Sequence, residues 1–279
     1  MAGSPAGIRF ADVGYCIYCG TTTGDLTLEH IVAKGLGGTL KLPKASCEAH
    51  RRITSKVERY CLREMFGSFR LHTNLNQSAP PPSLPHIIIG DGGTRQVRDV
   101  AVTDYPYALA LACFPQPGIL AGREPTDSFQ LKPWFWVADG EIERQQRLHG
   151  GAGFSSPEFH PTMFCRMLAK IALGFAVAMM TPKGISFEPL VRDLIVRGSP
   201  TPFHLVGGDL VAPPAATEPV LHELKWRLEH PGYLVVTIRL FAELGTPLYH
   251  VVVGKCLDES VPISRPTPFC ILPPEWREM

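Results

Sequence analysis

The sequence predicts an α+β protein: an N-terminal unit of two strands and a helix stapled by zinc, followed by a larger mixed α+β domain. Three observations support this. Cysteine and histidine pairs with equal spacing occur twice within the first 50 residues, a proline-rich stretch covers residues 76–85, and strand-like and helix-like patterns follow it. Since proline-rich segments favour extended spacers, we expect a module at residues 1–75, a linker at 76–85 and a second domain at 86–279.

Two cysteines two residues apart form the first half of the predicted zinc site. Cys16 and Cys19 are followed by Gly20, which suits the left-handed backbone of a tight turn. Cys47 and His50 repeat the same spacing after 27 intervening residues, enough for a hairpin. Three thiolates and one imidazole are a common ligand set for tetrahedral structural zinc.

The second ligand pair is predicted to open a helix. Ser46 is a candidate N-cap, and Glu48 lies in the first turn, where negative charge is favourable. Apolar residues then recur four apart, and Gly67 is a fitting C-terminal stop. Residues 26–28 alternate as a strand does, so the predicted order is knuckle, strand, loop, strand, helix.

A carboxylate directly precedes a histidine at the end of that strand. The imidazole of His30 can deprotonate a water near pH 7, because its ordinary pKa is about 6.5. Glu29 can bind Mg²⁺ or Mn²⁺, hard ions that stabilise charge developing on a phosphate. We therefore interpret His30 as a general base and Glu29 as a ligand of a catalytic divalent ion.

Residues 15–66 resemble the zinc-containing branch of the HNH endonucleases, the ββα-metal nucleases. That family has a C-x2-C pair, an acid-His-Ile strand, a glycine-rich loop and a second C-x2-C pair that opens a helix. The corresponding motifs here are Cys16 and Cys19, Glu29-His30-Ile31, residues 35–38, and Cys47 with His50. The resemblance implies a nuclease with His30 as general base, Glu29 on the catalytic metal and a structural zinc ion.

Three departures from the family pattern stand out. The last zinc ligand is His50 instead of cysteine, and the chain has no asparagine between Thr21 and Thr73 to orient the general base. Arg51 stands where the family has an asparagine or histidine that binds the catalytic metal, and a guanidinium does not bind cations. Either Glu58, two turns on, or His50 itself would then supply the missing ligand, or the site binds its metal weakly; we favour His50 as a zinc ligand.

Basic residues surround this region. The module has ten basic and six acidic residues, whereas the rest of the chain has 17 and 20. The residues we expect to contact nucleic-acid phosphates are Lys34, Lys41, Lys44, Arg51, Arg52 and Lys56. We predict DNA as the partner, with RNA as an alternative, and a C-terminal domain that selects the target or contacts a partner protein.

The remaining sequence predicts secondary structure but no chemistry. Strands are expected at residues 86–89 and 134–137, helices at 162–180 and 186–197, and a hairpin from 233–241 and 248–254. Hydrophobic residues make up 45% of the 279, enough for a core, which excludes a wholly disordered chain.

The apolar stretches are short or contain prolines, so we expect no membrane span and a cytoplasmic protein. The other five cysteines, which have no partner at ligand spacing, are expected to be buried thiols.

The leading hypothesis is a metal-dependent DNA endonuclease. The alternative is a non-catalytic zinc module that binds nucleic acid or a protein, and a third is a zinc-dependent hydrolase with an open zinc position. Geometry separates the first two: in a nuclease, Glu29 and His30 face one solvent-open point, and in a binding module they diverge into packing.

Overall fold

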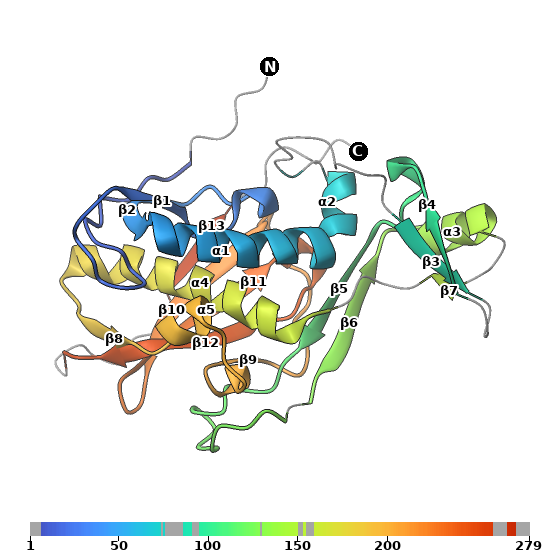
Figure 1. The fold of residues 1–279 in the computed structure, drawn as a ribbon. Coiled ribbons are helices and arrows are strands. Elements are labelled where there is room, and N and C mark those ends of the chain that lie inside the picture. The colour runs from blue at the N-terminus through green and yellow to red at the C-terminus, as the bar shows by residue number, and fades with distance from the viewer. Residues whose placement is uncertain are drawn as a thin grey trace.

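The computed structural model describes residues 7–73, 75, 86–90, 95–128, 130–149, 153–154, 159–258 and 267–271. The predicted linker at 76–85 lies outside these residues. The architecture is mixed α+β, as predicted, with a long central helix covering one face of a six-stranded sheet (Figure 1).

The N-terminal unit has the predicted order of two strands and a helix. Strands β1 (Leu26–His30) and β2 (Lys41–Cys47) pair antiparallel, and the turn η1 (Lys34–Leu36) lies in the loop between them. Helix α1 (Glu48–Tyr60) follows β2 directly.

The ends of α1 differ from the prediction. Its N-cap is Cys47 and not Ser46, whose hydroxyl hydrogen-bonds the carbonyl of Cys47. A π-helical turn, η2 (Cys61–Met65), continues the helix, and α2 (Gly67–Thr73) begins where a stop was expected. The side chains of Cys61 and Met65 are buried, so tertiary packing favours continuation of the helix over a stop.

The main sheet has the strand order β13-β10-β11-β12-β8, with β9 also pairing to β12. The predicted hairpin is β11 (Tyr233–Leu240) with β12 (Tyr249–Cys256), joined through the turn η6 (Ala242–Leu244). The other strands are β8 (Phe187–Pro189), β9 (Val206–Gly208), β10 (His222–Glu229) and β13 (Thr267–Ile271).

Smaller elements lie beside the main sheet (Figure 1). Two strands form a ribbon, β5 (Ala108–Cys113) with β6 (Lys132–Val137). A three-stranded sheet has the order β4 (Arg95–Asp99), β3 (His86–Gly90) and β7 (Gly153–Phe154). The remaining helices and turns are η3 (Val102–Asp104), α3 (Glu141–His149), η4 (Thr181–Lys183), α5 (Arg192–Val196) and η5 (Pro202–His204). The strands predicted at 86–89 and 134–137 are therefore confirmed.

The helix predicted at residues 186–197 is wrong for its first half. Phe187–Pro189 forms β8 at the edge of the main sheet, and only Arg192–Val196 is helical. Pro189 explains the difference, because proline disrupts a helix interior but is tolerated in an edge strand.

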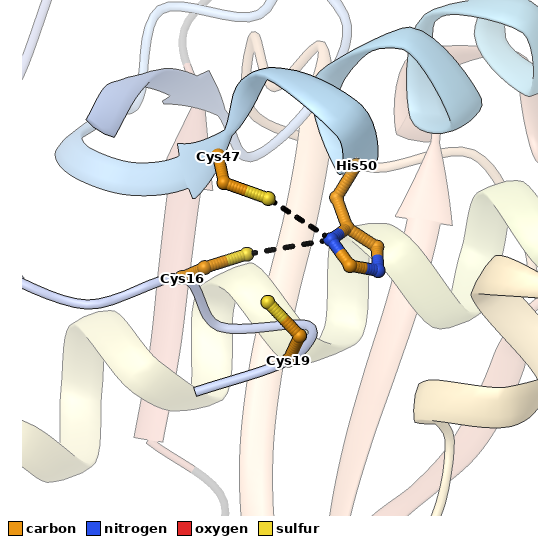
Figure 2. Close-up of side chains that lie close together, drawn as sticks. All are labelled: Cys16, Cys19, Cys47 and His50. Carbon is orange, nitrogen blue, oxygen red and sulfur yellow. Dashed lines mark hydrogen bonds between the residues drawn. The ribbon is translucent and has the colours of Figure 1, made fainter. Parts of the chain in front are cut away.

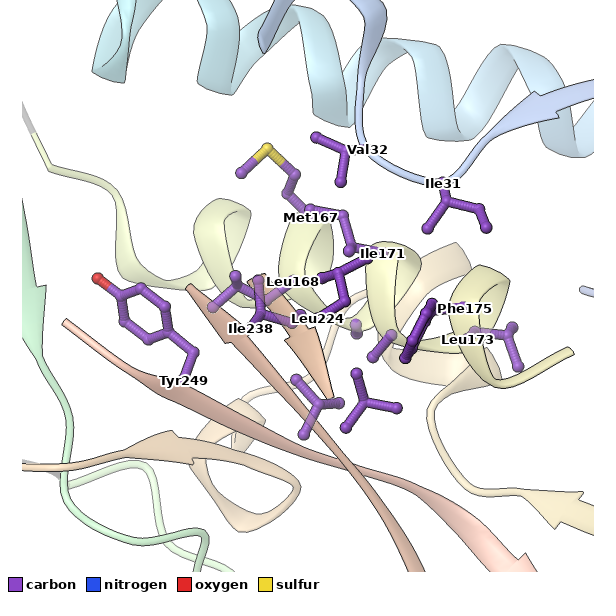
Figure 3. Close-up of a cluster of buried hydrophobic side chains, with 14 of the residues drawn as sticks. Ile31, Val32, Met167, Leu168, Ile171, Leu173, Phe175, Leu224, Ile238 and Tyr249 are labelled. Atoms are coloured by element: carbon purple, nitrogen blue, oxygen red, sulfur yellow. The ribbon is translucent and has the colours of Figure 1, made fainter. Parts of the chain in front are cut away.

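Helix α4 (Pro161–Met180) matches the predicted helix and lies between the N-terminal unit and the main sheet. Figure 3 shows its apolar side chains facing Ile31 and Val32 on one side and Leu224, Ile238 and Tyr249 of the sheet on the other. Gly174 of α4 lies beside Ile31, and a Cβ added there would make an ordinary contact with that side chain at 3.5 Å. One continuous hydrophobic core thus includes residues from both predicted domains.

Helix α4 with η4 is long and apolar enough to cross a membrane by length and composition. Within the described residues this is the one such segment. Of its most apolar 18-residue stretch, 83% is buried inside the protein. A core helix of a soluble domain has the same properties.

Candidate metal centre

The first ligand pair lies in a tight knuckle just before β1. The Gly20 amide donates to the carbonyl of Cys16 at 2.7 Å, and the Cys16 amide donates to Thr21 at 2.8 Å. Gly20 has a φ of +76°, as its position after Cys19 predicts. The Ile17 amide donates to Ala45 of β2, so the knuckle is fixed beside the second ligand pair.

The second pair begins α1. Cys47 is the N-cap, and His50 lies in the first helical turn, one turn away on the same face. The His50 ring stacks on Tyr18 with centroids 5.8 Å apart, which orients the imidazole. Burial lowers the pKa of His50, which favours the neutral imidazole that a metal requires.

The four side chains converge on one point. Their ligand atoms all lie within 4.8 Å of one another, and Nδ1 of His50 is 3.1 Å from Cys47 Sγ and 3.8 Å from Cys16 Sγ. Figure 2 shows the three sulfurs gathered around that nitrogen. Tetrahedral zinc, with bonds of about 2.3 Å to sulfur and about 2.0 Å to nitrogen, needs ligand atoms about 3.5–3.8 Å apart. The set fits a metal ion such as zinc after small shifts, in which the 3.1 Å pair separates slightly and the widest pairs draw closer.

The other described cysteines lie apart from this cluster. Cys61, Cys113 and Cys165 are buried, as expected, and Cys256 is half-buried. Cys270 lies in β13, and the structure does not describe the burial of its side chain.

Glu29 points into the protein interior and pairs with a lysine from α4. Its Oε1 is 2.7 Å from Nζ of Lys170, and the two side chains are 6% and 2% exposed. Burial, together with the negative charge of Glu58, raises the pKa of Glu29, and the Lys170 ammonium partly offsets this. Glu58 meets the same ammonium at 2.6 Å.

The two carboxylates that the sequence assigned to a catalytic divalent ion therefore do not fit that role. Glu29 and Glu58 both face the ammonium of Lys170, and positive charge at this point repels a metal cation. The sequence offered one signal of this arrangement: Arg166 and Lys170 are the two charged residues of a mostly apolar helix, and a charge on such a helix indicates a buried partner.

His30 lies at the end of β1, where strand alternation directs it to the face opposite Glu29. Its side chain is half-buried. Burial lowers its pKa, and the positive charges of Lys170, Lys41 and Lys34 act in the same direction. The imidazole is consequently neutral at pH 7 and flanked by two lysines of the N-terminal unit.

The predicted phosphate-binding residues divide into paired and unpaired groups. Arg51 and Arg52 both bind the carboxylate of Glu48, at 2.7 and 2.9 Å. Lys44 pairs with Asp12 at 2.8 Å. Among the described residues, no ion pair engages Lys34, Lys41 or Lys56.

Comparison of the chain with protein-family models, curated proteins and solved structures finds no match. The resemblance to HNH endonucleases therefore remains a prediction that rests on the sequence motifs alone.

Proposed function

We propose that this protein binds nucleic acid through a surface made by His30, Lys34 and Lys41, on an N-terminal unit held in shape by structural zinc. The main observation behind this proposal is the cluster of Cys16, Cys19, Cys47 and His50. A metal ion bound by these four residues would link the knuckle to the start of α1. That link supports the hairpin from which His30 and the lysines project.

The charge distribution supports a phosphate-binding surface. Lys41 is the cross-strand partner of His30, and Lys34 begins the turn that follows β1. Neither lysine has an acidic partner among the described residues, so both charges are available to a phosphate backbone. Contacts of this kind raise affinity without reading sequence.

The test is fluorescence anisotropy with labelled duplex DNA, duplex RNA and single strands at several salt concentrations. Lys34→Ala with Lys41→Ala should weaken binding and lower the slope of log affinity against log salt by about 1.8 for duplex DNA. The matched control replaces Lys132 and Lys255, two exposed lysines on other strands, and should change neither. Equal affinities for both double variants would contradict the proposal.

The second candidate is phosphodiester hydrolysis with His30 as general base. A half-buried imidazole with a lowered pKa favours it, because such a group can accept a proton at neutral pH. Nicking of supercoiled plasmid, measured with Mg²⁺, with Mn²⁺ and with EDTA, tests it. Nicking that disappears in His30→Ala while binding persists would support hydrolysis, and equal nicking by both proteins would reject it.

A further inference from the structure

The ammonium of Lys170 is enclosed by four oxygen atoms from the N-terminal unit. Glu29 Oε1 and Glu58 Oε1 lie at 2.7 and 2.6 Å, and Nζ also donates to the backbone carbonyl of His30. The carbonyl oxygen of Ile31 is 3.5 Å away. An ammonium has three hydrogens, and the three nearest oxygens use all of them.

Charge arithmetic distinguishes this group from an ordinary buried ion pair. Two carboxylates carry two negative charges, and Lys170 supplies a single positive charge. Two carboxylates and two carbonyls are oxygen ligands of the kind that hard divalent ions take. Without the lysine side chain, the same oxygens would face one another with no cation between them, at a point where Glu29 is buried and Glu58 is 20% exposed.

We propose that Lys170 is a tethered cation that takes the place of a divalent ion between Glu29 and Glu58, and that shortening it to alanine opens a Mn²⁺ site there. The native protein then needs no divalent ion at this point. Because Lys170 belongs to α4, packing of α4 against β1 and α1 brings its positive charge between the two carboxylates. This inference is independent of nucleic-acid binding at the His30 surface.

The primary test is a Mn²⁺ titration of zinc-loaded protein, followed by the loss of the electron paramagnetic resonance signal of free Mn²⁺. Lys170→Ala should bind one Mn²⁺ per chain, and Mn²⁺ should raise its melting temperature. Lys170→Met is the matched control, because its unbranched apolar chain fills the space and supplies no charge; it should bind none. Adding Glu58→Gln to Lys170→Ala should weaken Mn²⁺ binding at least tenfold.

A folded Lys170→Ala protein that binds no Mn²⁺ would overturn the inference. The unmodified protein provides a test that does not depend on whether the variant folds. It should bind no Mn²⁺ through Glu29, so Mn²⁺ binding by the native chain that disappears in Glu29→Gln would also overturn it. Loss of nucleic-acid binding by the Lys34 and Lys41 variant leaves this result unaffected, so the two proposals fail separately.

Discussion

A buried histidine, His222 on β10, should make the stability of this protein depend on pH. Its side chain is fully buried, with Nε2 2.7 Å from the carbonyl oxygen of Leu36. The Phe241 amide donates to Nδ1 at 3.2 Å, so Nδ1 is the acceptor and Nε2 carries the proton. Both nitrogens are satisfied only in the neutral ring, which holds η1 against the main sheet.

The magnitude follows from the two pKa values. Burial lowers the pKa of His222 from its ordinary 6.5 to about 4. The unfolded chain therefore takes up a proton below pH 6.5, whereas the folded protein resists until about pH 4. Stability is complete above pH 6.5 and declines as pH falls, by about 1.3 kcal/mol between pH 7.5 and 5.5 and by about 3 kcal/mol in full.

The assay is urea unfolding of zinc-saturated protein at pH 7.5 and pH 5.5, comparing the parent with His222→Gln. Glutamine is polar and of similar length but does not titrate, so the variant should be less stable at pH 7.5 and lose about 1.3 kcal/mol less on acidification. The other histidines contribute equally to the pH dependence of stability in both proteins, so their contributions cancel in the comparison. Equal losses in parent and variant would refute the assignment.

Three further outcomes are expected. Cys47→Ser should lose bound zinc and melt at lower temperature, whereas Cys256→Ser should keep its zinc; elemental analysis and calorimetry measure both. Gly38→Ala should lower the free energy of unfolding in urea by about 2 kcal/mol, because its Cβ would lie 2.0 Å from a backbone oxygen. The control Gly67→Ala should leave the free energy of unfolding unchanged, because its Cβ would meet nothing nearer than 4.0 Å. Phe69→Ala should cost about 3–5 kcal/mol, since this buried ring packs 4.7 Å from that of Phe241.

A specific result would contradict each of these three predictions. Full zinc content in Cys47→Ser would remove that residue from the ligand set. Equal stabilities of the two glycine variants would mean that the loop after β1 adjusts freely. A loss below about 1 kcal/mol for Phe69→Ala would indicate that the ring is not part of the core.

Much of the N-terminal unit could be predicted from the sequence because its signals are local. The spacing of Cys16 with Cys19, and of Cys47 with His50, brings each pair together within a single turn. Gly20 adopts the left-handed backbone that its position predicts. The long apolar run of α4 and the hairpin of β11 and β12 were likewise predictable, since periodicity and turn residues act over short distances.

The tertiary structure alone decided which charges meet. Lys170 lies 140 residues after His30 in sequence, and no local pattern relates it to Glu29 or Glu58. Packing of α4 against the hairpin buries Lys170 and Glu29 and leaves Glu58 20% exposed. The three charges pair there because an unpaired charge in the interior is costly. The sequence therefore determined the four candidate metal ligands, through short-range geometry. Whether Glu29 faces a metal or a lysine depended on the packing of distant segments.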